Sequence, residues 1–243
     1  MAEANLASIW VYLSATPLSG LTITLIAYSI AHRFYVRLNS NPLLHPVISS
    51  VVILITFLML TDTSYSAYFE GGQFVHFLLG PATVALAVPL YQQFGKLRRL
   101  WLPLSITLVA GVIIGALSSI GIARLLGASL QTQLSLAPKS VTAPVAMGIS
   151  EQIGGLPSLT AVLVVATGIL GAVLGDKLFK LLKIEDESVK GIAMGITAHG
   201  IGTARAFQIS REMGAFSGLA MALSAFATAI ILPWLLNITG LLG

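Results

Sequence analysis

Five stretches of the chain are apolar over a length that can cross a membrane. A helix needs about 20 mostly apolar residues to span the hydrocarbon core. A shorter segment, Leu6 to Ala15, is interpreted as a short helix set off by Pro17. The pattern predicts an all-α, multi-pass helical bundle in the lipid bilayer, with residues 1–243 as a single domain. The five stretches run from Leu18 to Val36, Pro42 to Leu60, Leu100 to Ile122, Leu156 to Leu178 and Phe216 to Leu236.

Three other segments are shorter, and glycine, proline or polar residues interrupt them. They are Gly80 to Phe94, Lys139 to Gly155 and Gly191 to Ile209. Irregular backbone at membrane depth survives only where protein or a water-filled cavity surrounds it. We therefore expect about six full spans, and we expect the second and third segments to be re-entrant hairpins or broken helices. The alternative is that both segments cross fully, which gives eight spans.

The interrupted segments share a weak repeat. Val84 to Gly95, Ala143 to Gly154 and Thr203 to Gly214 read VALAVPLYQQFG, APVAMGISEQIG and TARAFQISREMG, with closing glycines 59 and 60 residues apart. A long apolar span follows each one. Repeats of this kind are typical of transporters built from inverted halves, so we predict repeat units at 80–126, 139–182 and 190–237. The alternative is chance similarity among helices rich in small residues.

Composition agrees with a membrane protein and argues against several functions. Of the 243 residues, 56% are hydrophobic and 9% are charged, whereas about 25% are charged in soluble domains. The mean hydropathy is +0.92. Cysteine is absent and the four histidines show no metal-ligand spacing, so we expect no metal and no cofactor. The sequence contains no Walker A, GxSxG or HExxH motif, which argues against an enzyme.

Lysine and arginine gather in small groups between the apolar stretches. Such groups are typical of cytoplasmic loops in membrane proteins, and they argue against a nucleic-acid partner. The pattern places both termini outside the cytoplasm. It also requires the two re-entrant segments to enter from opposite faces of the membrane. The groups are Arg33 with Arg37; Lys96 with Arg98 and Arg99; and Lys177, Lys180, Lys183 and Lys190.

The motif PKSVTAP, residues 138–144, is the strongest local signal. Its second proline and its polar residues predict the start of a short helix, where free backbone N–H groups and the helix dipole attract anions. Lys139 adds a full charge, and Ser140 and Thr142 add hydroxyl donors. We therefore expect these three residues to bind a small carboxylate. The alternative is an ordinary helix cap with a lysine that reaches the membrane interface.

The segment GIAMGITAHGIGTARA, residues 191–206, is the second signal. Its glycines favour close helix packing or an unwound backbone. Arg205 can hold a carboxylate bidentately, His199 can relay a proton, and Thr203 can bind a substrate hydroxyl or keto oxygen. The alternatives are an interfacial arginine and an interhelical histidine. We expect this segment to meet the Lys139 segment near the middle of the bilayer.

Glu151 is the candidate for coupling to a proton or another cation. It follows the Lys139 helix start by about three helical turns. Asp62 ends an apolar stretch and is interpreted as interfacial. Asp176 stands beside Lys177 and is interpreted as a paired carboxylate.

PKSVT followed by AHGIGTARA resembles the LrgB/CidB family. NPLL at 41–44, GPATVALAVPLY at 80–91 and GILGAVLGDKLF at 168–179 fit the same family. The resemblance covers nearly the whole chain and implies a multi-pass protein of the bacterial inner membrane, usually paired with a small LrgA/CidA-type membrane protein. The resemblance further implies one of two functions. The first is transport, like that of plastid glycolate/glycerate carriers or like pyruvate uptake by bacterial members. The second is holin/antiholin-like control of murein hydrolases and lysis.

We expect a secondary transporter of small monocarboxylates. A holin needs only a few oligomerising amphipathic helices, whereas two interrupted segments with cationic residues suit a substrate site inside a membrane. The alternatives are a holin/antiholin-like regulator of murein hydrolase export and cell lysis, and a membrane scaffold for the small partner. The expected partners are a small carboxylate, an LrgA/CidA-type protein and further copies of this chain.

Overall fold

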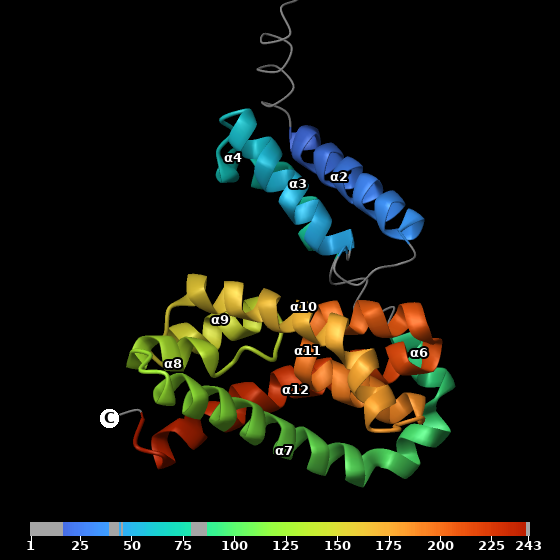
Figure 1. The fold of residues 1–243 in the computed structure, drawn as a ribbon, viewed down its shortest axis with the longest axis vertical. Coiled ribbons are helices and arrows are strands. Elements are labelled where there is room, and N and C mark those ends of the chain that lie inside the picture. Colours follow the sequence, from blue (N-terminus) through green and yellow to red (C-terminus); the bar gives the residue numbers. More distant parts are fainter. Residues whose placement is uncertain (1–16, 39–43, 45, 79–86, 242–243) are drawn as a thin grey trace, which may run out of the picture. The chain divides into compact units, whose positions relative to one another are not determined.

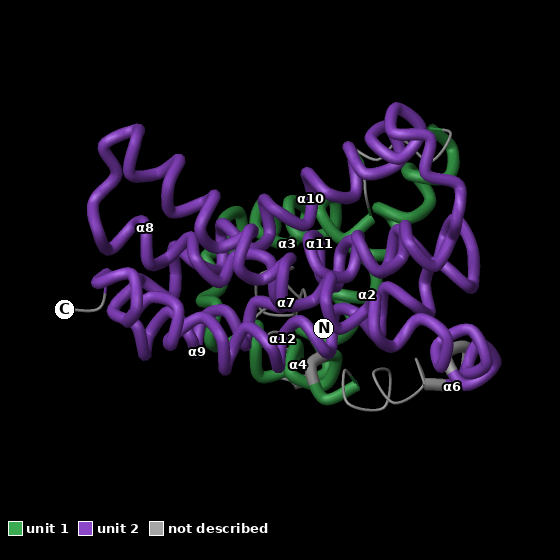
Figure 2. Tube along the Cα trace, turned by 90° about the horizontal axis from the view of Figure 1, so that it is seen from below, with its two compact units in different colours: residues 1–85 green, residues 86–243 purple. Residues whose placement is uncertain are grey.

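The computed structural model describes residues 17–38, 44, 46–78 and 87–241, and this part of the chain is helical without strands. It forms two compact units, residues 1–85 (unit 1) and 86–243 (unit 2), coloured separately in Figure 2. The expected helix at Leu6 to Ala15 lies outside the described residues. So do residues 80–86 of the first interrupted segment.

Unit 1 consists of α2 (Pro17–Arg37), α3 (Pro46–Leu60) and α4 (Tyr65–Phe77). Helix α2 packs against both of the others. Gly20 lets the backbone of α4 approach, because a side chain there would press on the Tyr68 carbonyl oxygen. The Thr24 and Tyr68 hydroxyls then form a 2.8 Å hydrogen bond. Helix α4 was not predicted from the sequence.

Unit 2 contains three helices that are long and apolar enough to cross a membrane: α7 (Phe94–Leu125), α10 (Pro157–Leu181) and α12 (Arg211–Ile238). They confirm three of the five predicted spans, and α7 starts six residues before the predicted Leu100. The other two predicted spans correspond to α2 and to α3, and α3 has 15 residues. The total number of spans stays a prediction. Figure 1 shows the helices in order.

One end of unit 2 is joined by ion pairs, and we call it the basic end. Lys96 near the start of α7 donates to Asp186 at 3.1 Å and to Glu212 at 2.7 Å. These two carboxylates stand at the starts of α11 (Glu187–Ile209) and α12. The contact brings the second and third basic groups of the sequence to the same end of the unit.

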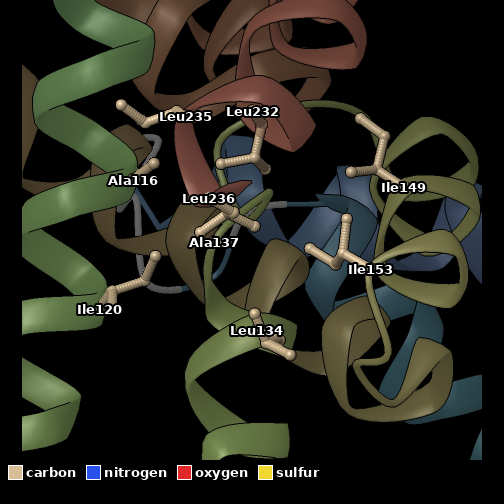
Figure 3. Close-up of a cluster of buried hydrophobic side chains, with 9 residues drawn as sticks. All are labelled: Ala116, Ile120, Leu134, Ala137, Ile149, Ile153, Leu232, Leu235 and Leu236. Atoms are coloured by element: carbon tan, nitrogen blue, oxygen red, sulfur yellow. The ribbon is translucent and has the colours of Figure 1, made fainter. Parts of the chain in front are cut away.

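The opposite end, which we call the far end, is held by a cluster of buried apolar side chains (Figure 3). It joins the second half of α7 to the last turns of α12 and to two short helices, α8 (Leu130–Leu136) and α9 (Ala143–Gln152). Burying a leucine or isoleucine side chain stabilises the fold by about 1.5–3 kcal/mol. The cluster consists of Ala116, Ile120, Leu134, Ala137, Ile149, Ile153, Leu232, Leu235 and Leu236.

Helices α8 and α9 form a hairpin that starts and finishes at the far end. After α9 the chain returns to α8, where the Leu156 amide donates to the Ser135 hydroxyl at 2.8 Å. The Thr160 hydroxyl donates to the Ser135 carbonyl at 3.0 Å. The hairpin turns at residues 137–142, so the predicted break in the Lys139 segment is confirmed.

Helix α11 is a second hairpin, because its backbone reverses at His199, where φ is 40° and ψ is −133°. A straight helix of 23 residues would be about 34 Å long. Instead, the Ser210 hydroxyl just after α11 donates to the Glu187 carboxylate at its start, at 3.1 Å. Both ends therefore lie at the basic end, which supports re-entry over a full crossing.

The two hairpins enter unit 2 from opposite ends, as the charge pattern predicted. Helix α7 leads from the basic end to the far end, α10 returns, and α12 leads to the far end again. The predicted repeats correspond to a short helix followed by a long one: α6 (Ala87–Gln92) with α7, α9 with α10, and the second half of α11 with α12. Whether these units are related as an inverted repeat stays a prediction.

Candidate functional site

The tips of the two hairpins meet at a small cavity, which we call the tip cavity. The turn after α8 contributes Ser140 and Val141, and the second hairpin contributes Ile196 just before its reversal. The remaining lining comes from the middle of α7 and of α12, so the cavity lies about halfway along the long helices. The full lining is Gly111, Val112, Gly115, Ala116, Ala137, Pro138, Ser140, Val141, Ile196, Ser224 and Thr228.

Gly111 on α7 makes the close approach of the second hairpin possible. At Gly111 an added Cβ would lie 2.7 Å from Cγ2 of Ile196, so only glycine lets the second hairpin approach α7 so closely. At Gly115 an added Cβ would lie 3.8 Å from Oγ of Ser140. The second hairpin therefore depends on glycine at position 111, whereas the first hairpin leaves room for a small side chain at position 115.

Lys139 lies between the tip cavity and a larger pocket. Its ammonium group donates to the Gly115 carbonyl and to the Ser140 hydroxyl, each at 3.4 Å. These distances exceed the usual 2.7–3.2 Å of a good hydrogen bond, so both contacts are weak. The same side chain lines a pocket between α10 and α11, which we call the α10–α11 pocket.

The α10–α11 pocket has a volume of about 530 Å³ and is mainly apolar. Its polar side chains are Lys139, Thr167 on α10 and Thr197 on the second hairpin. Lys139 and Thr197 therefore line the same pocket, and they belong to the two segments that the sequence predicted to meet. The whole lining is Lys139, Thr167, Leu170, Gly171, Leu174, Gly175, Leu178, Phe179, Leu182, Ile184, Ala193, Met194 and Thr197.

His199 forms the tip of the second hairpin and is 4% exposed. Its Nε2 lies 2.9 Å from the Val164 carbonyl, and since a carbonyl only accepts, Nε2 carries a proton and donates it. A Cβ at Gly168 would lie 2.7 Å from the imidazole, so glycine is required on α10 here. Val164 also packs against Val141 of the first hairpin, which links the two tips.

Arg205 and Thr203 lie on the returning half of the second hairpin and have protein partners. Arg205 donates to Asp176 at 2.9 Å, with side chains 16% and 30% exposed. The Thr203 and Ser217 hydroxyls form a 2.9 Å hydrogen bond. Asp176 is thus paired as expected, but with Arg205. The structure brings Lys139 and Ser140 to the second hairpin and directs Arg205 to a carboxylate of α10.

The two remaining predicted residues lie elsewhere on the first hairpin. Thr142 is the N-cap of α9, and its side chain makes no capping hydrogen bond. Glu151 lies near the end of α9 and is exposed. Groups of three or more histidine, aspartate or glutamate side chains that could hold a metal ion do not occur among residues 17–38, 44, 46–78 and 87–241.

Sequence reasoning missed the contribution of α12 to the site. Ser224 and Thr228 line the tip cavity, and both are buried. A signal was present, because Ser217, Ser224 and Thr228 recur on one face of an otherwise apolar helix at helical spacing.

Comparison with known proteins identifies the family. A family model described as the LrgB-like family matches residues 24–238. The chain belongs to the LrgB-like family. Uncharacterized protein YwbG of Bacillus subtilis is 36% identical over 89% of this chain and 96% of the relative. No solved structure matches the chain.

Two further relatives in the LrgB-like family have functional names. The holin-like protein CidB of Staphylococcus epidermidis is 29% identical over 88% of this chain and 93% of the relative. The antiholin-like protein LrgB of Bacillus cereus is 28% identical over 93% of this chain and 98% of the relative. The two names compare these relatives with a holin and with an antiholin.

Proposed function

We propose that this LrgB-like protein is a secondary transporter of small monocarboxylates such as glycolate, glycerate or pyruvate, in the inner membrane of a bacterium. The observation that carries the proposal is the meeting of two opposed hairpin tips beside Lys139. Interrupted helices that meet halfway across a membrane are how many secondary transporters build a substrate site. A pore made only of oligomerising helices has no need for such an arrangement.

The substrate carboxylate binds in the α10–α11 pocket against the Lys139 ammonium. The pocket volume of about 530 Å³ lies within the usual range of ligand sites. The Thr167 and Thr197 hydroxyls supply further polar contacts, and the remaining walls are apolar. A charge-assisted hydrogen bond contributes about 1.5–3 kcal/mol net, which suits the reversible binding that a carrier requires.

Alternating access follows from the two entry directions. The first hairpin enters from the far end, and the second hairpin enters from the basic end. A small rocking of one hairpin with its long helix then opens the site to one side at a time. His199 at the second tip is positioned to take part in this movement, since its ring joins the tip to α10.

A second candidate function is holin/antiholin-like regulation of murein hydrolase export and cell lysis. The names of the CidB and LrgB relatives favour it, and they support it more directly than they support transport. In either role we expect two kinds of partner, an LrgA/CidA-type membrane protein and further copies of this chain. Co-purification of the two chains from one membrane tests the partner.

Uptake of radiolabelled glycolate and pyruvate into proteoliposomes tests the first function, with and without the small partner. Lys139→Ala should lower uptake roughly 10- to 150-fold, which corresponds to the loss of one or more charge-assisted bonds. Lys180→Ala is the matched control, because Lys180 is exposed in the last turn of α10. Absence of uptake in every lipid and partner combination, together with altered lysis timing in cells, would reject transport in favour of regulation.

A further inference from the structure

The tip cavity contains hydroxyl groups that the proposed carboxylate site does not use. Ser224 is 2% exposed and Thr228 is 5% exposed, and both line the cavity. Neither hydroxyl hydrogen-bonds to another residue in the described part of the chain. Buried hydroxyls are normally paired, and an unpaired one is costly. Two such groups on one wall therefore point to a polar occupant.

The cavity is large enough for only one small particle. Its volume is about 10 Å³, which corresponds to a single water-sized sphere. A monocarboxylate does not fit there, whereas one water molecule or one desolvated monovalent cation does. Size alone separates this cavity from the α10–α11 pocket, which holds about 530 Å³.

The chemistry of the walls favours a cation. Three of the lining residues, Ser140, Ser224 and Thr228, carry a hydroxyl group. The Gly115 carbonyl oxygen lies beside them, where it accepts from Lys139. Hard monovalent and divalent cations prefer oxygen ligands. No lining residue in the described part of the chain carries a carboxylate, so the ligand set is neutral and suits a single positive charge.

A positive charge already uses part of this ligand set. The Lys139 ammonium contacts the Gly115 carbonyl and the Ser140 hydroxyl, each at 3.4 Å. These long contacts leave the ammonium easily displaced. Two cations at such short range repel each other strongly inside a protein. The ammonium in its present position and a second cation in the cavity therefore exclude each other.

We propose that the tip cavity is a binding site for one monovalent cation of the size of Na⁺, formed by Ser140, Ser224, Thr228 and the Gly115 carbonyl. The cation competes with the Lys139 ammonium for the same oxygens. A carboxylate in the α10–α11 pocket attracts the ammonium, frees the cavity and neutralises its charge, so the two ligands bind together. This last step rests on the proposed transport function, whereas cation binding itself does not.

Binding of radioactive ²²Na⁺ to the purified full-length protein tests the site. Lys139→Met removes the competing ammonium and should bind Na⁺ at least tenfold more tightly than the wild type. In that background, Ser224→Ala or Thr228→Val should weaken Na⁺ binding at least tenfold. Ser119→Ala is the matched control, because Ser119 is a buried serine of α7 whose hydroxyl donates to the Ala116 carbonyl, and it should leave Na⁺ binding unchanged.

The outcomes separate the two proposals. If Lys139→Met binds no Na⁺ while its melting temperature and gel-filtration profile match the wild type, the cavity holds water only and the inference is overturned. The inference also fails if Ser224→Ala and Thr228→Val bind Na⁺ as well as Ser119→Ala does. Na⁺ binding without carboxylate uptake would support the site and reject transport. Carboxylate uptake that does not depend on Na⁺, together with no bound ²²Na⁺, would support transport and reject the cation site.

Discussion

At the scale of single residues, the pairing of Arg205 with Asp176 changes how the second hairpin is interpreted. The sequence suggested that this arginine holds the substrate, but its guanidinium donates to a carboxylate of α10 at 2.9 Å. Both side chains are mostly buried, with exposed fractions of 16% and 30%. Truncating one member of such a pair leaves the other charge poorly compensated. A mutational cycle can therefore distinguish an ion pair from a substrate ligand.

We predict that Arg205→Ala lowers the stability of the protein by roughly 1–3 kcal/mol, because Asp176 loses its partner. The double variant Arg205→Ala/Asp176→Asn should recover much of that loss and much of the uptake. Thermal unfolding and proteoliposome uptake on the four members of the cycle are the measurements. If uptake stays absent in the double variant while stability returns, Arg205 contacts the substrate directly.

At the scale of elements, glycines determine how closely the hairpins pack. A side chain at Gly195 would press on the Ser217 carbonyl and would lie 2.9 Å from Cβ of Ala220. The first half of α11 and the start of α12 therefore touch along their backbones. A glycine with free space around it, such as Gly148 on α9, has no such role.

Gly195→Ala should destabilise the protein by about 1–3 kcal/mol, since overpacking forces α11 and α12 apart. Gly148→Ala is the control, and it should be neutral or should stabilise by about 0.5–1 kcal/mol because alanine favours a helix interior. Melting temperatures in detergent report both effects. Equal melting temperatures for the two variants would contradict the close packing of α11 on α12.

The start of the second hairpin is stabilised by Asp186, the N-cap of α11. The Ser188 hydroxyl, and after it the Lys96 ammonium, donate hydrogen bonds that hold the pKa of the Asp186 carboxyl well below its usual range. A carboxyl group whose pKa is lowered in the folded protein adds stability at pH values above its pKa in the unfolded chain, about 3.9. That added stability is lost as the pH falls below this pKa. The contribution is reduced by solvent, because the side chain is about half exposed.

We expect Asp186→Asn to lower the melting temperature slightly at neutral pH, since asparagine keeps the cap and loses the ion pair with Lys96. The difference from the wild type should stay constant above about pH 5 and should shrink as the pH falls below about 4. Melting curves of both proteins across this range are the measurement. A difference that grows toward low pH would contradict the assignment.

The elements were predictable wherever one segment of sequence is sufficient to define them. Apolar length located α7, α10 and α12, and the prolines and glycines located both hairpins. Helix α4 was missed because Gly71 and Gly72 weaken its helical signal. Asp176 could not be assigned to Arg205, because the two are 29 residues apart and local patterns do not report distant pairing. The part that Ser224 plays in the tip cavity could not be predicted from this residue alone, because single hydroxyls are common in apolar helices.

At the scale of the whole molecule, unit 2 separates its charges along the long helices. Lys96 and Lys190 stand at the basic end with the residues of the α10–α11 loop, whereas the far end is built around an apolar cluster. Membrane proteins keep basic loops in the cytoplasm. The arrangement therefore predicts that the basic end faces the cytoplasm and that the far end, where α12 finishes, faces outward.

Cysteine labelling can test this orientation cleanly, because the chain has no cysteine of its own. Glu185→Cys, in the exposed loop at the basic end, should react with a membrane-impermeant maleimide only after the cells are opened. Leu126→Cys, exposed at the end of α7, should react in intact cells. The reverse pattern would overturn the predicted orientation, and with it the prediction that both termini lie outside.

The position of the hairpin tips has an electrical consequence. Because both tips end near the middle of the long helices, a charge held there stands roughly halfway across the voltage of an energised membrane. Moving one elementary charge across the full voltage is worth about 2.3 kcal/mol per 100 mV, so reaching the tips from either side is worth about 1.2 kcal/mol per 100 mV. Each movement of the Lys139 ammonium away from the tips is thus a small current. Entry and exit of charged ligands should then depend on voltage to similar extents.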